Sequence, residues 1–373
     1  MNPSALPLFP VQTLAYPRHR HASEHELASQ GHLALRIARL LGWDVFGPGR
    51  LGRPTGGSQY YYVPDRTLTG PWRSRVLGIL NEGHLFGGVV PHGFVATKAI
   101  SHGLWDRSSH APQGWVHALG ATLQDVVLPG FAAYDTREAY QAGLFLLQRG
   151  PVRIKALQAN AGRGQRLVQN AQALAAALQD AELCAHGVVL EENLDELVTY
   201  SVGWCRIGDH ALAYVGTQSL TTDNQRHTVY GGSMLRCVRG GPEALSQLEL
   251  PADHARAVRL AIQYDAAVGA AYPALFASRR NYDVAIGETR DARPCAGVLE
   301  QSWRAGGASP AELAALHFLS LHPEEAEVTS FTRERYGESA PVPAGLECIY
   351  RGVDRAVGPI TKMVGIVGQD HGA

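Results

Sequence analysis

Two short apolar segments, 282–287 and 295–301, each carry one acidic residue, Asp283 and Glu300. Both segments have the length and composition of strands, and the short stretch between them predicts that they are neighbours in one sheet. Because side chains alternate along a strand, such a pair can present both acids on the same side. Two carboxylates at an open site suit Mg²⁺, which takes hard oxygen ligands and keeps waters and substrate phosphates.

The residues after this pair, Arg304, Gly306 and Gly307, precede a predicted helix that begins at Ser309. The two glycines permit a tight turn, and Ser309 is predicted to cap the helix with proline at its first position. A helix N-terminus beside an arginine suits an anion or a carboxylate.

An alternating segment, 152–157, predicts a half-buried strand that carries Lys155, and a glycine loop follows it. Gly162 and Gly164 can adopt positive φ, so that backbone N–H groups converge on phosphate oxygens. The alternative is an ordinary turn beside a surface lysine.

The chain holds 33 basic residues, and its lysines are Lys98, Lys155 and Lys362. A lysine that persists among arginines indicates a position where a compact ammonium is needed, because guanidinium and ammonium are not interchangeable. The alternative is that these lysines are residual surface positions.

A short apolar strand, 187–190, delivers Glu191 and Glu192 into a loop that continues to Leu194. Such a segment can form a hinge between two lobes, where backbone groups pair with an adenine edge. The alternative is a strand end with solvated acids.

Composition excludes several function classes. The 373 residues carry 33 Lys and Arg against 34 Asp and Glu, so the net charge of −1 gives no basic field for nucleic acid. No apolar run approaches the ~18 residues of a membrane helix, and the first residues lack the pattern of a secretion signal. The five cysteines have no CxxC spacing, so neither a disulfide framework nor a zinc site is predicted. We expect a cytoplasmic protein.

The remaining pattern indicates a mixed α/β and α+β architecture of several domains. Strand and helix signals alternate over 23–97, beginning with a capping box at Ser23 and Glu26. Strand candidates at 198–206, 211–219 and 228–238 predict an antiparallel sheet. The predicted units are an N-terminal arm at 1–22, a small α/β domain at 23–97, and two larger units at 98–190 and 191–373.

The order and spacing of these pieces resemble the ATP-grasp superfamily: a strand lysine with a glycine loop, an acidic hinge, then paired acids followed by an arginine and two glycines. The resemblance covers roughly 87–321, with the α/β segment in the place of that family's preceding domain. Within the superfamily the chain looks like an uncharacterised bacterial group. The fold implied is therefore an ATP-grasp fold with a small α/β domain before it, and the cofactors implied are ATP and Mg²⁺.

The resemblance also implies roles for individual residues. The nucleotide-binding residues implied are Lys98, Lys155, Gly162, Gly164, Glu191, Glu192 and Leu194. Asp283, Glu300 and Ser302 match metal ligands, although the family often has asparagine in place of Ser302. Arg304 and Lys155 match the catalytic positions, and Arg304 faces the reacting acyl group.

The function implied is an ADP-forming ligase that activates a carboxylate as an acylphosphate for attack by an amine or a similar nucleophile. The alternatives are an ATP-binding regulatory module without ligase activity and a small-molecule kinase of the same fold. The expected partners are small-molecule carboxylate and amine substrates, with neither nucleic acid nor a membrane. A homodimer is expected only because it is the commonest symmetry.

Overall fold

The computed structural model describes residues 11–14, 23–43, 45–46, 60–106, 110–158, 164–337 and 342–368. Gly162 and most of the segment expected to be an N-terminal arm lie outside these ranges. Among the described helices, none is both long and apolar enough to cross a membrane.

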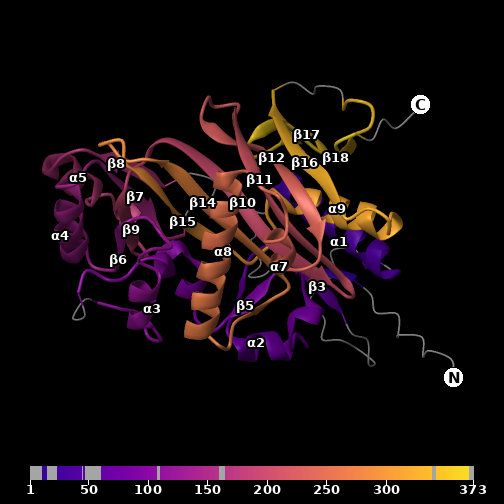
Figure 1. Ribbon diagram of the computed structural model, residues 1–373, viewed down its shortest axis with the longest axis horizontal. Helices are drawn as coiled ribbons and strands as arrows, with labels where there is room; N and C mark the ends of the chain where they lie inside the picture. The colour runs from indigo at the N-terminus through magenta and orange to yellow at the C-terminus, as the bar shows by residue number, and fades with distance from the viewer. Residues whose placement is uncertain are drawn as a thin grey trace.

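The centre of the molecule is an eight-stranded antiparallel sheet with the order β15-β14-β10-β11-β12-β16-β18-β17 (Figure 1). Its strands are β10 (Asp195–Ile207), β11 (His210–Thr222), β12 (Thr228–Arg239), β14 (Arg279–Glu288), β15 (Pro294–Ser302), β16 (Glu327–Tyr336), β17 (Glu347–Asp354) and β18 (Gly358–Ile366). The expected antiparallel arrangement of β10, β11 and β12 is confirmed.

Helices cover both faces of this sheet. On one face α8 (Ala252–Ala271) packs Tyr264 and Val268 against the sheet residues Val202 and Val284. On the other face, α1 (Glu24–Leu41) and α9 (Ser309–Leu321) share a core with sheet residues such as Leu212. The residues predicted as a capping box open α1 with Ser23 as its N-cap, and the backbone N–H of Ser23 donates to Glu26 Oε2 at 3.0 Å.

A smaller lobe is built on a four-stranded sheet with the order β6-β9-β7-β8, beside the large sheet in Figure 1. Its elements are β6 (Gly130–Ala133), α4 (Thr136–Leu147), β7 (Val152–Ala156), β8 (Gln165–Val168), α5 (Ala171–Ala177), α6 (Ala181–Cys184) and β9 (Val188–Glu192). Asp135 is the N-cap of α4, and its side chain accepts hydrogen bonds from two backbone N–H groups of the first turn. Alternate residues of β7 and β9, including Ile154 and Leu190, form the core of this lobe.

The N-terminal part contributes to two small three-stranded sheets. One has the order β2-β1-β3, and the other, β13-β5-β4, takes β13 from later in the chain. The elements of this part and the remaining helices are β1 (Val11–Leu14), β2 (Val45–Phe46), β3 (Tyr61–Pro64), β4 (Leu68–Thr69), α2 (Pro71–Val76), β5 (Gly88–Val90), α3 (His117–Thr122), α7 (Pro242–Leu245) and β13 (Phe276–Ala277).

One local expectation changes in this N-terminal part. Residues 11–14, expected to belong to an extended arm, form a strand, because β1 pairs in parallel with both β2 and β3. The short helix α2 begins at Pro71, which fits a first turn, and ends at Val76, just before Gly78 adopts a positive φ. The domain boundaries stay a prediction, and β9 continues across residue 190.

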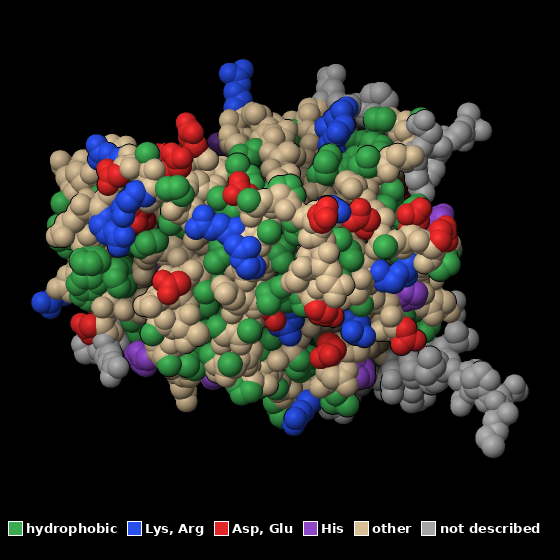
Figure 2. Space-filling model, in the orientation of Figure 1, with side chains coloured by type: hydrophobic (Ala, Val, Ile, Leu, Met, Phe, Trp, Pro, Cys, Tyr) green, Lys and Arg blue, Asp and Glu red, His purple; other side chains and the backbone are tan. Residues whose placement is uncertain are grey.

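Charged side chains of both signs are interspersed over the face drawn in Figure 2. Two arginines of β12, Arg236 and Arg239, are held by contacts within the fold. Arg236 pairs with Glu327 at 2.8 Å, and Arg239 donates to backbone carbonyls at the C-terminal end of α9, including that of Leu319 at 2.8 Å. These two arginines are therefore engaged in holding the fold.

Candidate active site

The two predicted acids lie opposite each other in the large sheet. β14 and β15 pair antiparallel, with Asp283 directly across from Glu300. Neighbouring positions Tyr282 and Val284 point into the core beneath α8, so Asp283 lies on the opposite face. On that face the Gln218 side chain of β11 donates a 2.8 Å hydrogen bond to Asp283 Oδ1. Partial burial and the charge of Glu300 raise the pKa of Asp283 above its ordinary value.

Lys98 connects this acid pair to the smaller lobe. It begins a 3₁₀ turn, Lys98–Ser101, and its side chain is buried. Its Nζ lies 3.3 Å from Glu300 Oε2 and donates to the carbonyl of Ala156 at 3.3 Å, where β7 ends. The Lys98 ammonium group therefore joins the end of β7 to Glu300, which lies about two hundred positions further along the chain.

Lys155 lies on β7 and pairs with Glu191 on the adjacent strand β9. Both side chains are buried, with exposed fractions of 5% and 2%. Burial alone would raise the pKa of Glu191, but the charges and hydrogen bonds of Lys155 and His102 outweigh it and lower that pKa to about 2. The pair therefore fixes the position of the ammonium group in a water-poor setting.

His102 is a residue that sequence reasoning missed. Its Nε2 lies 3.4 Å from Glu191 Oε2, so the carboxylate lies between an imidazole and an ammonium group. The ring fits because residue 130 is glycine, since a Cβ there would lie 2.9 Å from ring atoms of His102. The sequence offered no reason to single out His102 among the sixteen histidines of the chain, because it has no metal-ligand spacing. Its place four residues after Lys98 was the available hint.

The hinge residues Glu192 and Leu194 occupy different surroundings. The Glu192 side chain is buried, and arginines approach its carboxylate at 3.7 Å (Arg149) and 3.8 Å (Arg293). Its backbone N–H donates to the carbonyl of Pro129 at 2.9 Å. Proline has no N–H, so Pro129 cannot return a hydrogen bond to the Glu192 carbonyl. Leu194 packs in a small apolar cluster with Ala285 of β14.

The glycine loop is described only in part. Gly164 has a φ of +64°, as the loop prediction requires, and its carbonyl accepts a 2.9 Å hydrogen bond from the N–H of Ala156. Gly164 thus closes the turn between β7 and β8. Gly162 lies outside the described residues, so its role stays a prediction.

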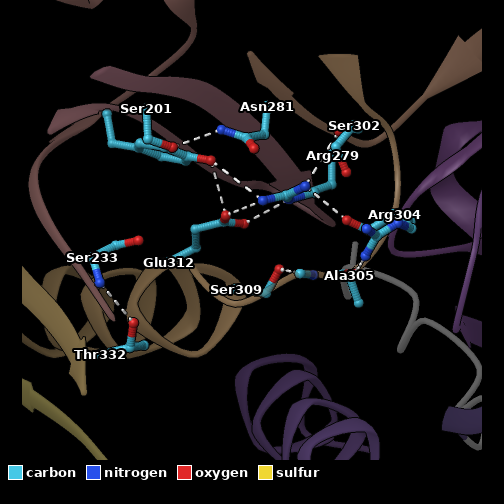
Figure 3. Close-up of polar contacts among 12 residues, drawn as sticks. Ser201, Ser233, Arg279, Asn281, Ser302, Arg304, Ala305, Ser309, Glu312 and Thr332 are labelled. Carbon is cyan, nitrogen blue, oxygen red and sulfur yellow. Dashed lines mark hydrogen bonds and ion pairs between the residues drawn. The ribbon is translucent and has the colours of Figure 1, made fainter. Parts of the chain in front are cut away.

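Arg304 follows β15, and its side chain is partly buried. Burial lowers the pKa of its guanidinium, and the negative charges of Glu300 and Asp283 act in the opposite direction. One guanidinium nitrogen, Nη1, donates to the carbonyl of Ala305 at 2.9 Å. Ser302 lies opposite Asn281 at the end of the same strand pair, near Arg304 in Figure 3.

The predicted cap of α9 is wrong. The N-cap is Ala308, which has no side-chain hydrogen bond, and Ser309 is the first helical residue. The Ser309 hydroxyl instead accepts a 3.0 Å hydrogen bond from the N–H of Gly306. The serine therefore closes the glycine turn before the helix and does not cap the helix itself.

Within the described ranges, no group of three or more His, Cys, Asp or Glu side chains is arranged to hold a metal ion. Any metal at this site would therefore depend on the Asp283–Glu300 pair and on oxygen atoms from other groups. The structure brings together Lys98, Glu300, Asp283 and Arg304, and it places the Lys155–Glu191 pair beside them through Ala156.

Three comparisons bear on identity. A family model matches residues 13–364, and its description is a protein of unknown function, DUF3182. A comparison with curated proteins finds no match.

Solved structures show similarity over nearly the whole chain. One is the biotin carboxylase domain of the 2-oxoglutarate carboxylase of Hydrogenobacter thermophilus, with 13% identity over 96% of this chain and 86% of that chain and a TM-score of 0.53. Another is the N5-carboxyaminoimidazole synthase of Aspergillus clavatus, with 11% identity over 98% and 95% of the two chains and a TM-score of 0.51. At such low identities the likeness shows the fold. The chain belongs to the DUF3182 family and has the ATP-grasp fold.

Proposed function

We propose that this protein binds Mg-ATP between the smaller lobe and the large sheet and uses it to join a carboxylate to an amine. The observation that carries the proposal is the position of Lys98, which lies 3.3 Å from Glu300 and contacts the end of the strand that bears Lys155. One ammonium group thus connects the residues expected to bind phosphate with the acids expected to bind metal.

The nucleotide end uses three features of the smaller lobe. Lys155, held by Glu191, and Lys98 supply positive charge for the phosphates. The carbonyl of Glu192, to which Pro129 cannot donate, suits the amino group of adenine, and the backbone of Leu194 completes the hinge. Gly164, with its positive φ, belongs to the loop expected to cover the phosphates.

The residues present also fit Mg²⁺. Asp283 and Glu300 lie opposite each other, and the negative charge of Glu300 makes ionisation of Asp283 less favourable. A divalent cation between the two carboxylates would offset this repulsion. Ser302 supplies a third, shorter oxygen group at the same strand end. When bound, Mg²⁺ would offset the negative charge on the transferred phosphoryl group.

The proposed reaction has two steps. A carboxylate oxygen attacks the γ-phosphorus, the bond to the β,γ-bridging oxygen breaks, and ADP leaves. The amine then attacks the carbonyl carbon of the acylphosphate, phosphate leaves, and the amine releases a proton to solvent. Arg304 orients the carboxylate and stabilises the negative charge that develops on its oxygen. The similar structures support the nucleotide part, since one contains MgADP with bicarbonate and another contains ADP with 5-aminoimidazole ribonucleotide.

The test is Mg-ATP binding by titration calorimetry with the parent protein, Glu300→Gln and Glu327→Gln. Glu300 is 35% exposed and paired with a lysine, and Glu327 is 45% exposed and paired with an arginine on the far strands, so the second variant is a matched control. We expect Glu300→Gln to weaken Mg-ATP binding by about tenfold or more, as for loss of a charged contact, and Glu327→Gln to leave it unchanged. Equal affinities for all three proteins would refute the metal assignment.

A second measurement separates the alternatives. ADP release is followed in mixtures of Mg-ATP with panels of carboxylates and amines. Release that depends on both substrates, with an amide product, supports the ligase. A stable phosphorylated product would indicate a kinase, and binding without release in any mixture would indicate a regulatory module.

A further inference from the structure

Arg279 is a fully buried charged residue that the proposed reaction does not use. It is the first residue of β14, and its side chain is 1% exposed. Two of its nitrogens contact the carboxylate of Glu312 on α9, with Nε to Oε2 at 3.1 Å and Nη2 to Oε1 at 2.6 Å. The hydroxyl of Tyr214 donates to the same carboxylate at 2.9 Å. Figure 3 shows Arg279 between Glu312 on one side and Ser302 and Arg304 on the other.

The third nitrogen of Arg279 points to the backbone of the site. Nη1 donates to the carbonyl of Ser302 at 3.2 Å and to the carbonyl of Arg304 at 2.7 Å. The carbonyl between them, that of Trp303, accepts from the hydroxyl of Thr67 at 3.1 Å. Three consecutive carbonyls are therefore fixed by side chains from elsewhere in the fold.

The buried charge pair is not explained by stability alone. A buried ion pair often contributes no more than apolar residues of the same volume, because desolvation offsets the attraction. Apolar residues could fill the space between β14 and α9, but they could not donate to the carbonyls of Ser302 and Arg304. A planar guanidinium meets both requirements at once, since its fork contacts Glu312 while its other nitrogen reaches the backbone.

We propose that Arg279 is a positioning residue that holds the backbone of 302–304, so that Ser302 and Arg304 face the acid pair. This proposal rests on the proposed function of Arg304. Arg279 acts through the backbone, because its guanidinium is buried and its Nη1 donates to the carbonyls of Ser302 and Arg304. The Glu312 carboxylate fixes the guanidinium, and α9 therefore contributes to the position of Arg304.

The test compares Arg279→Lys with Tyr214→Phe. Lysine keeps the positive charge beside Glu312 but cannot donate to Glu312 and both carbonyls together. Tyr214→Phe removes a hydrogen bond to the same carboxylate without touching the carbonyls, so it is the matched control. The readouts are backbone hydrogen exchange at 303–307, Mg-ATP affinity by calorimetry, and ADP release from Mg-ATP.

For Arg279→Lys we expect exchange at 303–307 to accelerate about tenfold while exchange in β7 and β9 is unchanged. We expect Mg-ATP affinity to fall less than the rate of ADP release, because Asp283 and Glu300 keep their places while Ser302 shifts. The rate of ADP release should fall by up to about 100-fold for a displacement near 1 Å. Tyr214→Phe should leave all three quantities near the parent values. Unchanged exchange at 303–307, or an equal effect of Tyr214→Phe, would overturn the proposal.

A second variant keeps the test decisive if Arg279→Lys fails to fold. Arg279→Met combined with Glu312→Leu removes both charges together, which a core tolerates better than loss of one. The same local acceleration at 303–307 is expected, and its absence would overturn the proposal. A parent protein that neither binds Mg-ATP nor releases ADP would instead refute the proposed function, and the exchange data would still decide whether Arg279 holds this backbone.

Discussion

Replacing Lys155 with methionine removes the ammonium group from a buried ion pair and leaves the Glu191 carboxylate behind. The two side chains are 5% and 2% exposed, and the His102 ring, 3.4 Å from the carboxylate, remains beside it. Breaking a buried pair from one side costs about 3–5 kcal/mol. Because His102 keeps part of the interaction, we expect a loss near the lower end, about 3 kcal/mol in the free energy of unfolding.

Removing both charges should recover most of that loss. In Lys155→Met with Glu191→Gln no unpaired carboxylate remains, so we expect a stability within about 1 kcal/mol of the parent. The assay is urea unfolding at pH 7, because urea does not screen charge. Lys362→Met is the control, since Lys362 pairs with Glu334 at 2.9 Å in a more exposed place and should cost only about 1 kcal/mol. Equal losses for Lys155→Met and Lys362→Met would refute the reasoning.

The Lys155–Glu191 pair also predicts how the stability of the protein depends on pH. The pKa of Glu191 in the folded protein is about 2, below the value near 4.3 expected for an unfolded chain. The stabilisation is therefore complete above about pH 4.3 and is lost as the pH falls towards 2. The stability difference between the parent and Lys155→Met should narrow as the pH falls from 7, because the buried Glu191 of the variant, without its lysine, takes up a proton at a higher pH than Glu191 of the parent. A difference that stays constant from pH 7 to pH 3 would contradict the assignment.

Three further predictions concern single residues. His102→Ala should weaken Mg-ATP binding about tenfold, as for loss of a charged hydrogen bond, and His102→Gln should restore part of the affinity, which calorimetry would measure. Asp283→Asn should leave thermal stability without Mg²⁺ unchanged or higher, since it removes repulsion from Glu300, yet it should weaken Mg-ATP binding; a loss of stability would contradict this. Gly88→Ala would bring a Cβ to 2.9 Å from the Cβ of Trp303 and should cost about 1–3 kcal/mol, measured as a lower thermal midpoint.

Local pattern was sufficient for the parts of the fold that depend on neighbouring residues. The capping box at Ser23 opens α1, and the pairing of β14 with β15 brings Asp283 opposite Glu300, as strand alternation and a short connection predict. The cap at Ser309 was mistaken, because a serine next to a glycine turn can bond either to the turn or to the helix. Sequence spacing does not distinguish these two partners.

Contacts between distant segments were beyond local pattern. The ion pair between Lys98 and Glu300 joins a 3₁₀ turn to the edge of the large sheet, and His102 reaches Glu191 only because Gly130 leaves room for its ring. A single sequence does not show which histidine enters which gap, since packing in three dimensions decides it. The family resemblance supplied positions for the lysines and acids, but it had no place for His102 or Arg279.

The two ends of the site differ in how their charges are satisfied. In the smaller lobe, Glu191 has an ammonium group on one oxygen and an imidazole near the other, so its pKa is lowered. At the acid pair, Lys98 contacts Glu300, whereas the neutral amide of Gln218 donates a hydrogen bond to Asp283, and the pKa of Asp283 is raised. A cation that arrived at the acid pair would therefore gain most at Asp283. Under the proposed function, this difference predicts that Mg²⁺ strengthens ATP binding through the large sheet, because the charges of the smaller lobe are already paired.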